Sequence, residues 1–273
     1  MHYSKFLKMT KLIDDATRRI AYRHPNLFSL LNRVECSYYS WQFDSRHGRF
    51  EAPLNPLKIV YVDPDSITRY SSRPVPYSWE NKYENIGMIT GGEWDQIGTI
   101  SVEDPLYHEL YGLETFEESV FFKSLYARFA ENVNWTDTPF IKRLLALDGA
   151  IPWTGCETKA DVMSRCRYLD SLYRRIDTDG YMTAREREVI KSPPRRLTHE
   201  IMVDVTRDGE LLLVDGKHRL AFAKILELQT VPIGIVVRHR EWMKERDRVW
   251  NENNAVLHPD LAELGKFKNW ELP

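Results

Sequence analysis

The stretch LLLVDGKHRLAFAKIL, residues 211–226, decides the fold class of this chain. An apolar run ends at Asp215 and Gly216, and a helix-forming segment follows at once. A short acceptor or a residue without Cβ suits the position that caps a helix, so Asp215 or Gly216 is expected to begin one. The pattern therefore predicts a strand, a tight glycine turn and a helix in direct succession.

Three side chains with donor groups, those of Lys217, His218 and Arg219, stand at the start of this predicted helix. The first turn of a helix also offers free backbone N–H groups and the positive end of the helix dipole, which favour a bound phosphate group. The alternative is that the basic side chains are solvated and that Gly216 only makes a turn. We interpret the segment as an anion site whose binding residues are Asp215, Gly216, Lys217, His218 and Arg219.

The longer segment VDGKHRLAFAKILELQTVPIGIVV, residues 214–237, carries a family resemblance. Its Asp-Gly-x-His-Arg turn, the helix at 219–227 and the strand that begins near Val231 and Pro232 resemble the signature of the ParB/sulfiredoxin-like superfamily. The resemblance is close over residues 195–240 and loose upstream. It implies a small α/β fold that binds a nucleotide with this turn, as do CTP-binding chromosome-partitioning proteins, sulfiredoxins that use ATP, and free-serine kinases.

The predicted elements together indicate an α+β fold, with a ParB/sulfiredoxin-like mixed sheet and helices. The core is expected at residues 57–240, with a helical insertion at about 105–178. A helical N-terminal extension at 1–50 precedes the core, and a helix and tail at 241–273 follow it. Strands are expected at residues 57–62, 201–205, 211–214 and 231–238, and helices at 105–130, 139–147, 157–178 and 241–252.

Composition and charge narrow the class of protein. The chain has 273 residues, of which 42% are hydrophobic and 29% charged, which is typical of a soluble globular protein. Its net charge of −2 gives no global field toward DNA or anionic membranes. Its three widely spaced cysteines argue against a disulfide scaffold or a zinc site, and no run is long and apolar enough to cross a membrane. We therefore expect a cytoplasmic protein.

The two ends of the chain carry signals for partners. Residues 3–23 predict a basic amphipathic helix, which can lie on a membrane surface, dock onto a partner or pack on its own domain. We favour packing and keep peripheral membrane contact as the alternative. The tail to Pro273, which carries Trp270, is expected to pack back or to form a homodimer.

A second segment, GGEWD at residues 91–95, follows a short apolar run. Glu93 and Asp95 are two positions apart, and an extended backbone would place both carboxylates on one side. Such a pair can hold a metal–nucleotide or act as a general base. The alternative is a β-turn with solvated carboxylates. We expect Glu93 and Asp95 to bind Mg²⁺ and, with His218, to be the catalytic residues.

The resemblance alone does not choose a function, because one fold carries several activities. Cysteine-sulfinic reductase activity is rejected, since no cysteine lies near the 215–219 turn. Among the branches of this superfamily, the free-serine kinases are the most similar to this chain in the chemistry that their residues imply. It implies a phosphotransferase that uses ATP or another nucleotide with Mg²⁺ and acts on a hydroxyl of a small molecule, sugar or glycolipid. This hypothesis requires Glu93, Asp95 and the 215–219 turn to converge on one pocket.

Two alternatives come from other classes of protein. A ParB-like nucleic-acid-binding or nuclease module would need a contiguous basic face, for which Arg195, Arg196, Arg238 and Arg240 are the candidates. The segment after Arg240 is expected to be too short for the helix-turn-helix domain of partitioning proteins. A non-catalytic nucleotide sensor would bind nucleotide without turnover, and its carboxylates would turn away from the phosphates.

Overall fold

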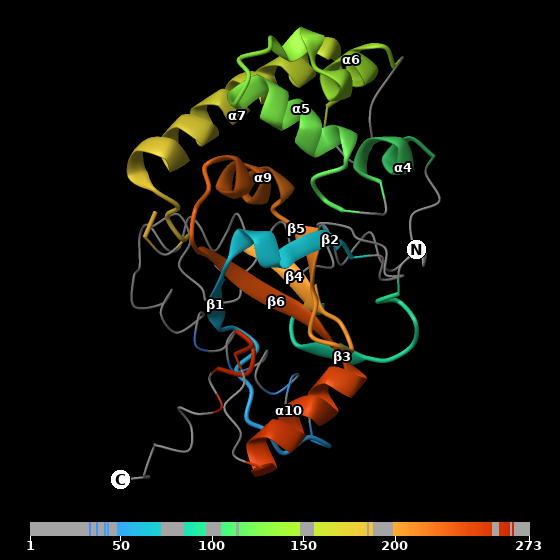
Figure 1. The fold of residues 1–273 in the computed structure, drawn as a ribbon, viewed down its shortest axis with the longest axis vertical. Helices are drawn as coiled ribbons and strands as arrows, with labels where there is room; N and C mark the ends of the chain where they lie inside the picture. Colours follow the sequence, from blue (N-terminus) through green and yellow to red (C-terminus); the bar gives the residue numbers. More distant parts are fainter. Residues whose placement is uncertain are drawn as a thin grey trace.

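The fold is known from a computed structural model, which describes most of the chain. The described residues are 33, 37, 41, 43, 48–71, 85–96, 105–112, 115–147, 156–184, 186–187, 199–252, 257–262 and 264. A mixed sheet lies at the centre, and helices stack over one of its faces (Figure 1). The predicted α+β class is confirmed. The basic helix predicted at 3–23 and the tail with Trp270 lie outside the described residues.

The sheet has six strands within the described residues, in the order β1-β6-β4-β5-β2, and β3 pairs with β6 beside that path. Their bounds are β1 Ile59–Val62, β2 Ile67–Tyr70, β3 Met88–Thr90, β4 Ile201–Val205, β5 Leu211–Asp215 and β6 Val231–His239. β4 and β5 form an antiparallel hairpin, and β6 runs parallel to β4. The sheet is therefore mixed, as the sequence predicted.

The register of these strands sets which loops share an end of the sheet. Val205 of β4 pairs with Leu211 of β5, so the hairpin turn lies at the end where β4 finishes. β3 pairs in parallel with the last residues of β6, which places the loop after Thr90 at that same end. Asp215 pairs with Met202 near the start of β4. The turn after β5 is therefore at the opposite end of the sheet.

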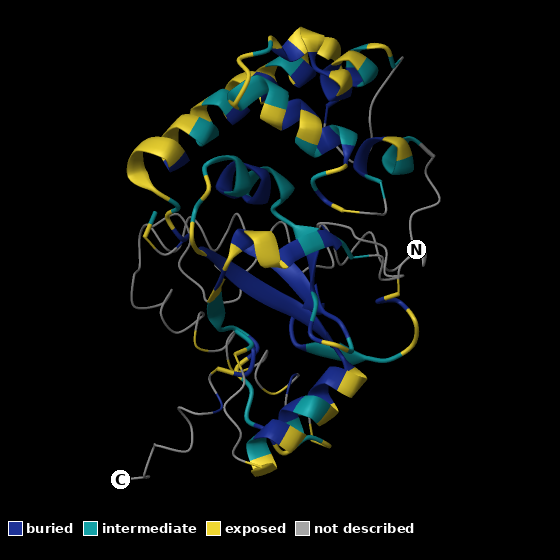
Figure 2. Ribbon diagram, in the orientation of Figure 1, coloured by how far each residue is buried: buried dark blue, intermediate teal, exposed yellow. Residues whose placement is uncertain are grey.

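Four helices form a layer above the sheet (Figure 1). They are α4 Pro105–Tyr111, α5 Val120–Phe129, α6 Pro139–Leu145 and α7 Lys159–Asp179. The helices predicted at 139–147 and 157–178 are found close to those bounds, but the single helix predicted at 105–130 is wrong, because α4 ends before Gly112, whose φ is +66°. A capping box, in which Thr158 and Asp161 exchange hydrogen bonds, begins α7. The apolar stripe of α7 is buried and includes Cys166, so this cysteine is a core residue. The outward faces of α5 and α7 are exposed (Figure 2).

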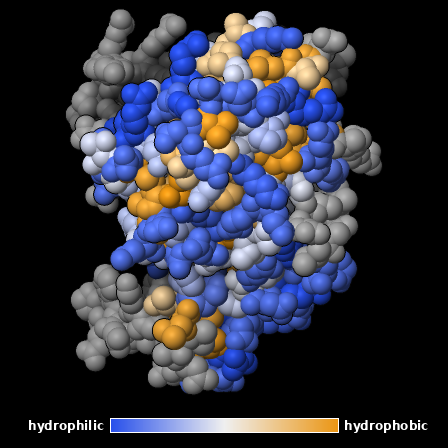
Figure 3. All heavy atoms as spheres, turned by 45° about the horizontal axis from the view of Figure 1, so that its top comes forward, coloured by the Kyte–Doolittle hydropathy of each residue, from blue (hydrophilic) through white to orange (hydrophobic). Residues whose placement is uncertain are grey.

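Helix α9 (Lys217–Ile225) lies between this layer and the sheet. Its Phe222 is fully buried and meets Phe129 of α5 and Tyr173 of α7 with ring centroids 5.0 and 5.4 Å apart. Edge-on aromatic pairs of this kind add about 0.5–1.5 kcal/mol each beyond the burial of their area. The outer surface of the layer is mostly hydrophilic, with separate small hydrophobic patches (Figure 3). The helical layer thus holds α9 firmly against the sheet.

Helix α10 (Arg240–Glu252) follows β6 directly and is anchored through a buried charge cluster. Asp260, which is 2% exposed, accepts hydrogen bonds from Arg238 of β6 (2.6 Å from Nη2) and from Nε1 of Trp242 (2.8 Å). Arg246 of α10 pairs with the same carboxylate at 3.1 Å, and its Nη2 donates to the carbonyl oxygen of Pro53. This cluster ties α10 and the segment around Asp260 to the end of β6.

None of the helices in the described part of the chain has both the length and the apolar character needed to cross a membrane.

The sheet buries both of its faces. Ile201, Val203 and Val205 of β4 face α9 and the helical layer, and Met202 faces a second cluster that contains Trp94. Alternation of this kind is what a strand with two covered faces requires.

Candidate functional site

The turn between β5 and α9 is built around Gly216, which is the residue that caps the helix, as the sequence predicted. Its φ is +88°, in the left-handed region that side chains with a Cβ adopt only under strain. A Cβ at this position would lie 2.9 Å from the Cα of Ile201, which is backbone and cannot swing aside. Glycine is therefore required here both by conformation and by space.

The first amide groups of α9 are open. The first hydrogen bond within the helix runs from the N–H of Leu220 to the carbonyl oxygen of Gly216, at 3.0 Å. The N–H groups of Lys217, His218 and Arg219 precede that bond, and no side chain among the described residues caps this helix. Residues 215–219 are half-buried. Uncapped amides at the positive end of a helix form a favourable place for an anion.

The amine of Lys217 lies among aromatic rings. Its Nζ donates to the Oη of Tyr111 at 2.6 Å and lies 3.9 Å from the centre of the Tyr111 ring. The ring of Phe121 is 5.4 Å away. Burial lowers the pKa of Lys217 to about 7, helped by Arg165 and opposed by Asp215. Lys217 is thus a cation only in part at neutral pH.

His218 contributes an aromatic ring to the site and no charge at neutral pH. Its ring stands edge-on to that of Phe121, with centroids 5.1 Å apart. Burial lowers the pKa of His218 well below its usual value, and the charges of Lys217 and Arg165 lower it further. The neutral ring packs against the core, so its predicted share in binding a phosphate by charge is weakened.

Arg219 supports the turn from behind. Its Nη2 donates to the carbonyl oxygen of Glu200 at 2.8 Å, and its Nη1 lies 4.0 Å from the buried carboxylate of that residue. The same carboxylate accepts a hydrogen bond from the N–H of Ala184 at 2.6 Å. Arg219 and Glu200 therefore join the start of β4, the segment after α7 and the Gly216 turn.

Glu93 and Asp95 lie close together, and the side chain of Arg207 binds both of their carboxylates. Arg207, in the β4–β5 hairpin, donates to Asp95 from its backbone N–H and from Nε at 2.9 Å each, and from Nη2 at 2.8 Å. The same Nη2 lies 3.0 Å from Glu93 and 2.8 Å from the carbonyl oxygen of Gly92. Asp95 is 2% exposed, and the side chain of Glu93 is exposed. We call these four residues the Arg207 clamp.

The Arg207 clamp does not meet the 215–219 turn, so the predicted convergence on one pocket is wrong. β5 has five residues, and its Leu211 and Asp215 ends are about 13 Å apart at the usual rise of a strand. The clamp lies at the Leu211 end, and the turn lies at the Asp215 end. Across the described residues no group of three or more His, Cys, Asp or Glu side chains could hold a metal ion. The two carboxylates instead hold the segment that follows β3 against the β4–β5 hairpin, through Arg207.

Acid should loosen the Arg207 clamp. Burial acts to raise the pKa of Asp95, but hydrogen bonds from Arg207 lower it to about 2. The unfolded pKa is about 3.9, so this contribution is fully present above about pH 4 and is lost as the pH falls toward 2. The shift corresponds to about 2 kcal/mol in the free energy of unfolding. Asp95→Asn should remove that part of the acid dependence in urea unfolding at about pH 3 and pH 6. An acid dependence that is unchanged in Asp95→Asn would refute this role.

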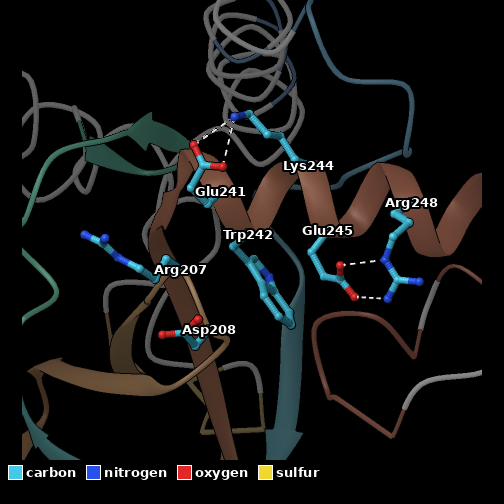
Figure 4. A pocket seen from close by; sticks show the side chains of 7 residues that line it. All are labelled: Arg207, Asp208, Glu241, Trp242, Lys244, Glu245 and Arg248. Carbon is cyan, nitrogen blue, oxygen red and sulfur yellow. Dashed lines mark hydrogen bonds and ion pairs between the residues drawn. The ribbon is translucent and has the colours of Figure 1, made fainter.

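A surface pocket of about 520 Å³ lies between the β4–β5 hairpin and α10 (Figure 4). It is lined by Arg207, Asp208, Glu241, Trp242, Lys244, Glu245 and Arg248. Its charges are largely compensated within α10, because Glu241 pairs with Lys244 and Glu245 pairs with Arg248. The sequence predicted a charged helix here but gave no signal for a pocket, since the hairpin and α10 meet only in the folded chain.

The basic face required by the nucleic-acid hypothesis is not formed as predicted. Arg238 is 3% exposed and is bound to Asp260, so it cannot contact a phosphate backbone. Arg240 is exposed, and Arg195 and Arg196 lie outside the described residues. A buried arginine with a carboxylate partner is a structural group. Of the four candidate arginines, one is thus excluded, and two lie outside the described residues.

Four residues around the turn were not predicted as parts of a site. Tyr111 and Phe121 have the helical spacing of an apolar face, which is typical of core residues. Arg165 and Glu200 carried no signal, since their distance to the turn along the chain hides their approach in space. A lysine placed among aromatic residues becomes visible only when α4, α5 and α9 are packed together.

Comparison of the chain with protein-family models, with curated proteins and with solved structures gave no match. The likeness of residues 195–240 to the ParB/sulfiredoxin-like superfamily therefore stays a prediction. The nucleotide, the Mg²⁺ and the phosphotransfer that this likeness implies are proposals to be judged on the geometry of the Gly216 turn.

Proposed function

We propose that the chain binds a phosphate group of a nucleotide at the turn formed by Asp215, Gly216 and the first turn of α9. One observation carries the proposal. The N–H groups of Lys217, His218 and Arg219 stand uncapped at a half-buried helix start that Gly216 alone can form. Backbone amides in this arrangement bind phosphate without any catalytic group. The nucleotide itself is supported by the resemblance of the Asp-Gly-x-His-Arg turn.

The separation of the Arg207 clamp from this turn favours binding over catalysis. A phosphotransferase needs a group that takes the proton of the acceptor hydroxyl close to the transferred phosphate. Glu93 and Asp95 lie at the other end of the sheet, and Asp95 is held by Arg207. We therefore place nucleotide binding, as in a sensor, ahead of phosphotransfer.

Phosphotransfer from ATP to a hydroxyl of a small molecule, sugar or glycolipid remains the second candidate. It is favoured by the amine of Lys217, whose pKa of about 7 suits proton transfer near neutral pH. The charge of Asp215 acts on that amine. In this hypothesis Asp215, and not Glu93 or Asp95, would take the proton of the acceptor hydroxyl. In this hypothesis Mg²⁺ enters with the nucleotide and neutralises the charge of the phosphates.

Thermal unfolding with increasing ATP, ADP or CTP, with and without Mg²⁺, tests the proposal. A ligand that binds only the folded chain stabilises it by about 2.7 kcal/mol at a hundredfold excess over its Kd, so Tm should rise with dose. Lys217→Ala should weaken the effect about tenfold or more, because a charge-assisted contact contributes about 1.5–3 kcal/mol. Lys123→Ala, an exposed lysine on α5, is the matched control and should behave as wild type.

Two results would count against nucleotide binding at this turn. The first is that no nucleotide raises Tm at any dose. The second is that Lys217→Ala and Lys123→Ala respond to ATP equally. Consumption of ATP that depends on a hydroxyl acceptor and is lost in Asp215→Asn would move phosphotransfer ahead of sensing.

A further inference from the structure

The amine of Lys217 has an acceptor but no counter-ion within the described part of the chain. Among the described residues, its one hydrogen bond goes to the phenol of Tyr111, and the faces of the Tyr111 and Phe121 rings lie close to it. No carboxylate among the described residues forms an ion pair with it. Aromatic faces attract an ammonium group, but a buried charge without an opposite charge stays unfavourable.

The charged and titratable groups around this amine lie on β5, α7, α9 and α4. Asp215 of β5 favours the ammonium form, and Arg165 of α7 opposes it. Within α9, Arg219 is cationic and His218 is neutral near pH 7. Tyr111 and Tyr107 of α4 are uncharged there, because burial raises the pKa of both. The single carboxylate of Asp215 therefore opposes the effects of burial and of Arg165, and the amine holds its proton only in part at neutral pH.

A phosphate at the start of α9 would supply the missing negative charge. Lys217 is the first residue of the helix, so its side chain begins at the same turn as the open amides. A terminal phosphate group carries nearly two negative charges at neutral pH, because its second pKa is about 6. A phosphodiester of a nucleic-acid backbone carries one. A dianion therefore favours the ammonium form of Lys217 more strongly than the single charge of a phosphodiester does.

We propose that this site takes a terminal, dianionic phosphate group and that Lys217 gains one proton from solvent when the phosphate binds. The inference rests on the proposed function and names its ligand class. The proton adds to Nζ, and no bond of the phosphate forms or breaks. Affinity should fall as the pH rises above neutrality, by up to about tenfold per pH unit, because the proton must then be taken from a more dilute pool.

Isothermal titration of ATP into the full chain at about pH 8, in two buffers with different ionisation enthalpies, measures this proton. At that pH the terminal phosphate has already lost its proton, so uptake reports on the protein. Wild type should take up about one proton per ATP bound. Lys217→Arg should bind ATP with no uptake, since arginine keeps its charge. Lys123→Arg is the control and should match wild type.

The outcomes separate the inference from the function on which it rests. Binding of ATP by wild type with no proton uptake would overturn the inference and leave nucleotide binding intact. Uptake that persists in Lys217→Arg would also overturn it, because another group would be titrating. Absence of ATP binding in every buffer would overturn the proposed function itself.

A second arm tests the ligand class. Two short single-stranded oligonucleotides of one sequence, with and without a 5′-terminal phosphate, are titrated into wild type. Only the phosphorylated strand should bind with proton uptake. Equal binding of both strands would overturn the preference for a terminal phosphate and would favour recognition of a nucleic-acid backbone.

Discussion

Gly216→Ala should abolish phosphate binding and lower the free energy of unfolding by about 1–3 kcal/mol from backbone strain alone. The new Cβ would sit 2.9 Å from the Cα of Ile201 at a φ of +88°. The turn would have to open, and the amides of Lys217, His218 and Arg219 would lose their common direction. Urea unfolding measures the stability, and calorimetry with ATP measures the binding.

Gly112→Ala is the matched control for this change. Gly112 also has a positive φ, +66°, but a Cβ there would meet nothing within 4 Å. This variant should show conformational strain without a clash and should bind ATP as wild type does. If Gly216→Ala bound ATP with wild-type affinity, the Gly216 turn could not be the phosphate site.

Asp260→Ala should be the most destabilising single change in the described part of the chain, at about 3–5 kcal/mol. The substitution leaves the guanidinium groups of Arg238 and Arg246 buried without their shared carboxylate. It also removes the acceptor of Trp242 Nε1. Burial acts to raise the pKa of Asp260, but the two arginines hold it well below the usual range, so acid should act in the same direction as the substitution.

Glu245→Gln is the control for the loss of Asp260. Glu245 pairs with Arg248 on the exposed face of α10 and should contribute little, as surface ion pairs do. Urea unfolding at neutral pH compares the two variants. Equal stability of Asp260→Ala and Glu245→Gln would contradict the view that this cluster anchors α10.

The local part of the fold could be predicted from the sequence. An apolar run, an Asp-Gly pair and a helix-forming segment predicted β5, the Gly216 turn and α9, because strand propensity, turn geometry and helix capping act between near neighbours. An Asp-Gly pair, here Asp208 and Gly209, is likewise typical of a turn such as the one in the β4–β5 hairpin. The apolar residues of α7 have the spacing of a helix with one buried face.

The long-range charge pairing could not be predicted in this way. Asp95 binds Arg207, which stands in a predicted hairpin turn more than a hundred positions along the chain. Arg238 was expected on a basic surface, yet its partner Asp260 lies in the C-terminal segment and both are buried. Charge patterns in one dimension show which groups can pair but not which approach in space.

The backbone of the candidate site could be predicted from the sequence, but the chemistry of its side chains could not. The turn and the open amides followed from residues 215–219 themselves. The low pKa of Lys217 follows from burial beneath Tyr111 and Phe121, which come from two helices distant in sequence. The expected catalytic pair, Glu93 and Asp95, was placed at the wrong end of the sheet because the register of β3 against β6 decides that end.

The central claim is that a phosphate group binds the first amides of α9. Backbone amide spectra of ¹⁵N-labelled protein, recorded during titration with ATP, test it most directly. We expect saturable shifts at the amides of Lys217, His218 and Arg219, and unchanged signals at Arg207 and Asp208. Shifts confined to Arg207 and Asp208 would place the ligand in the pocket beside α10 and contradict the account.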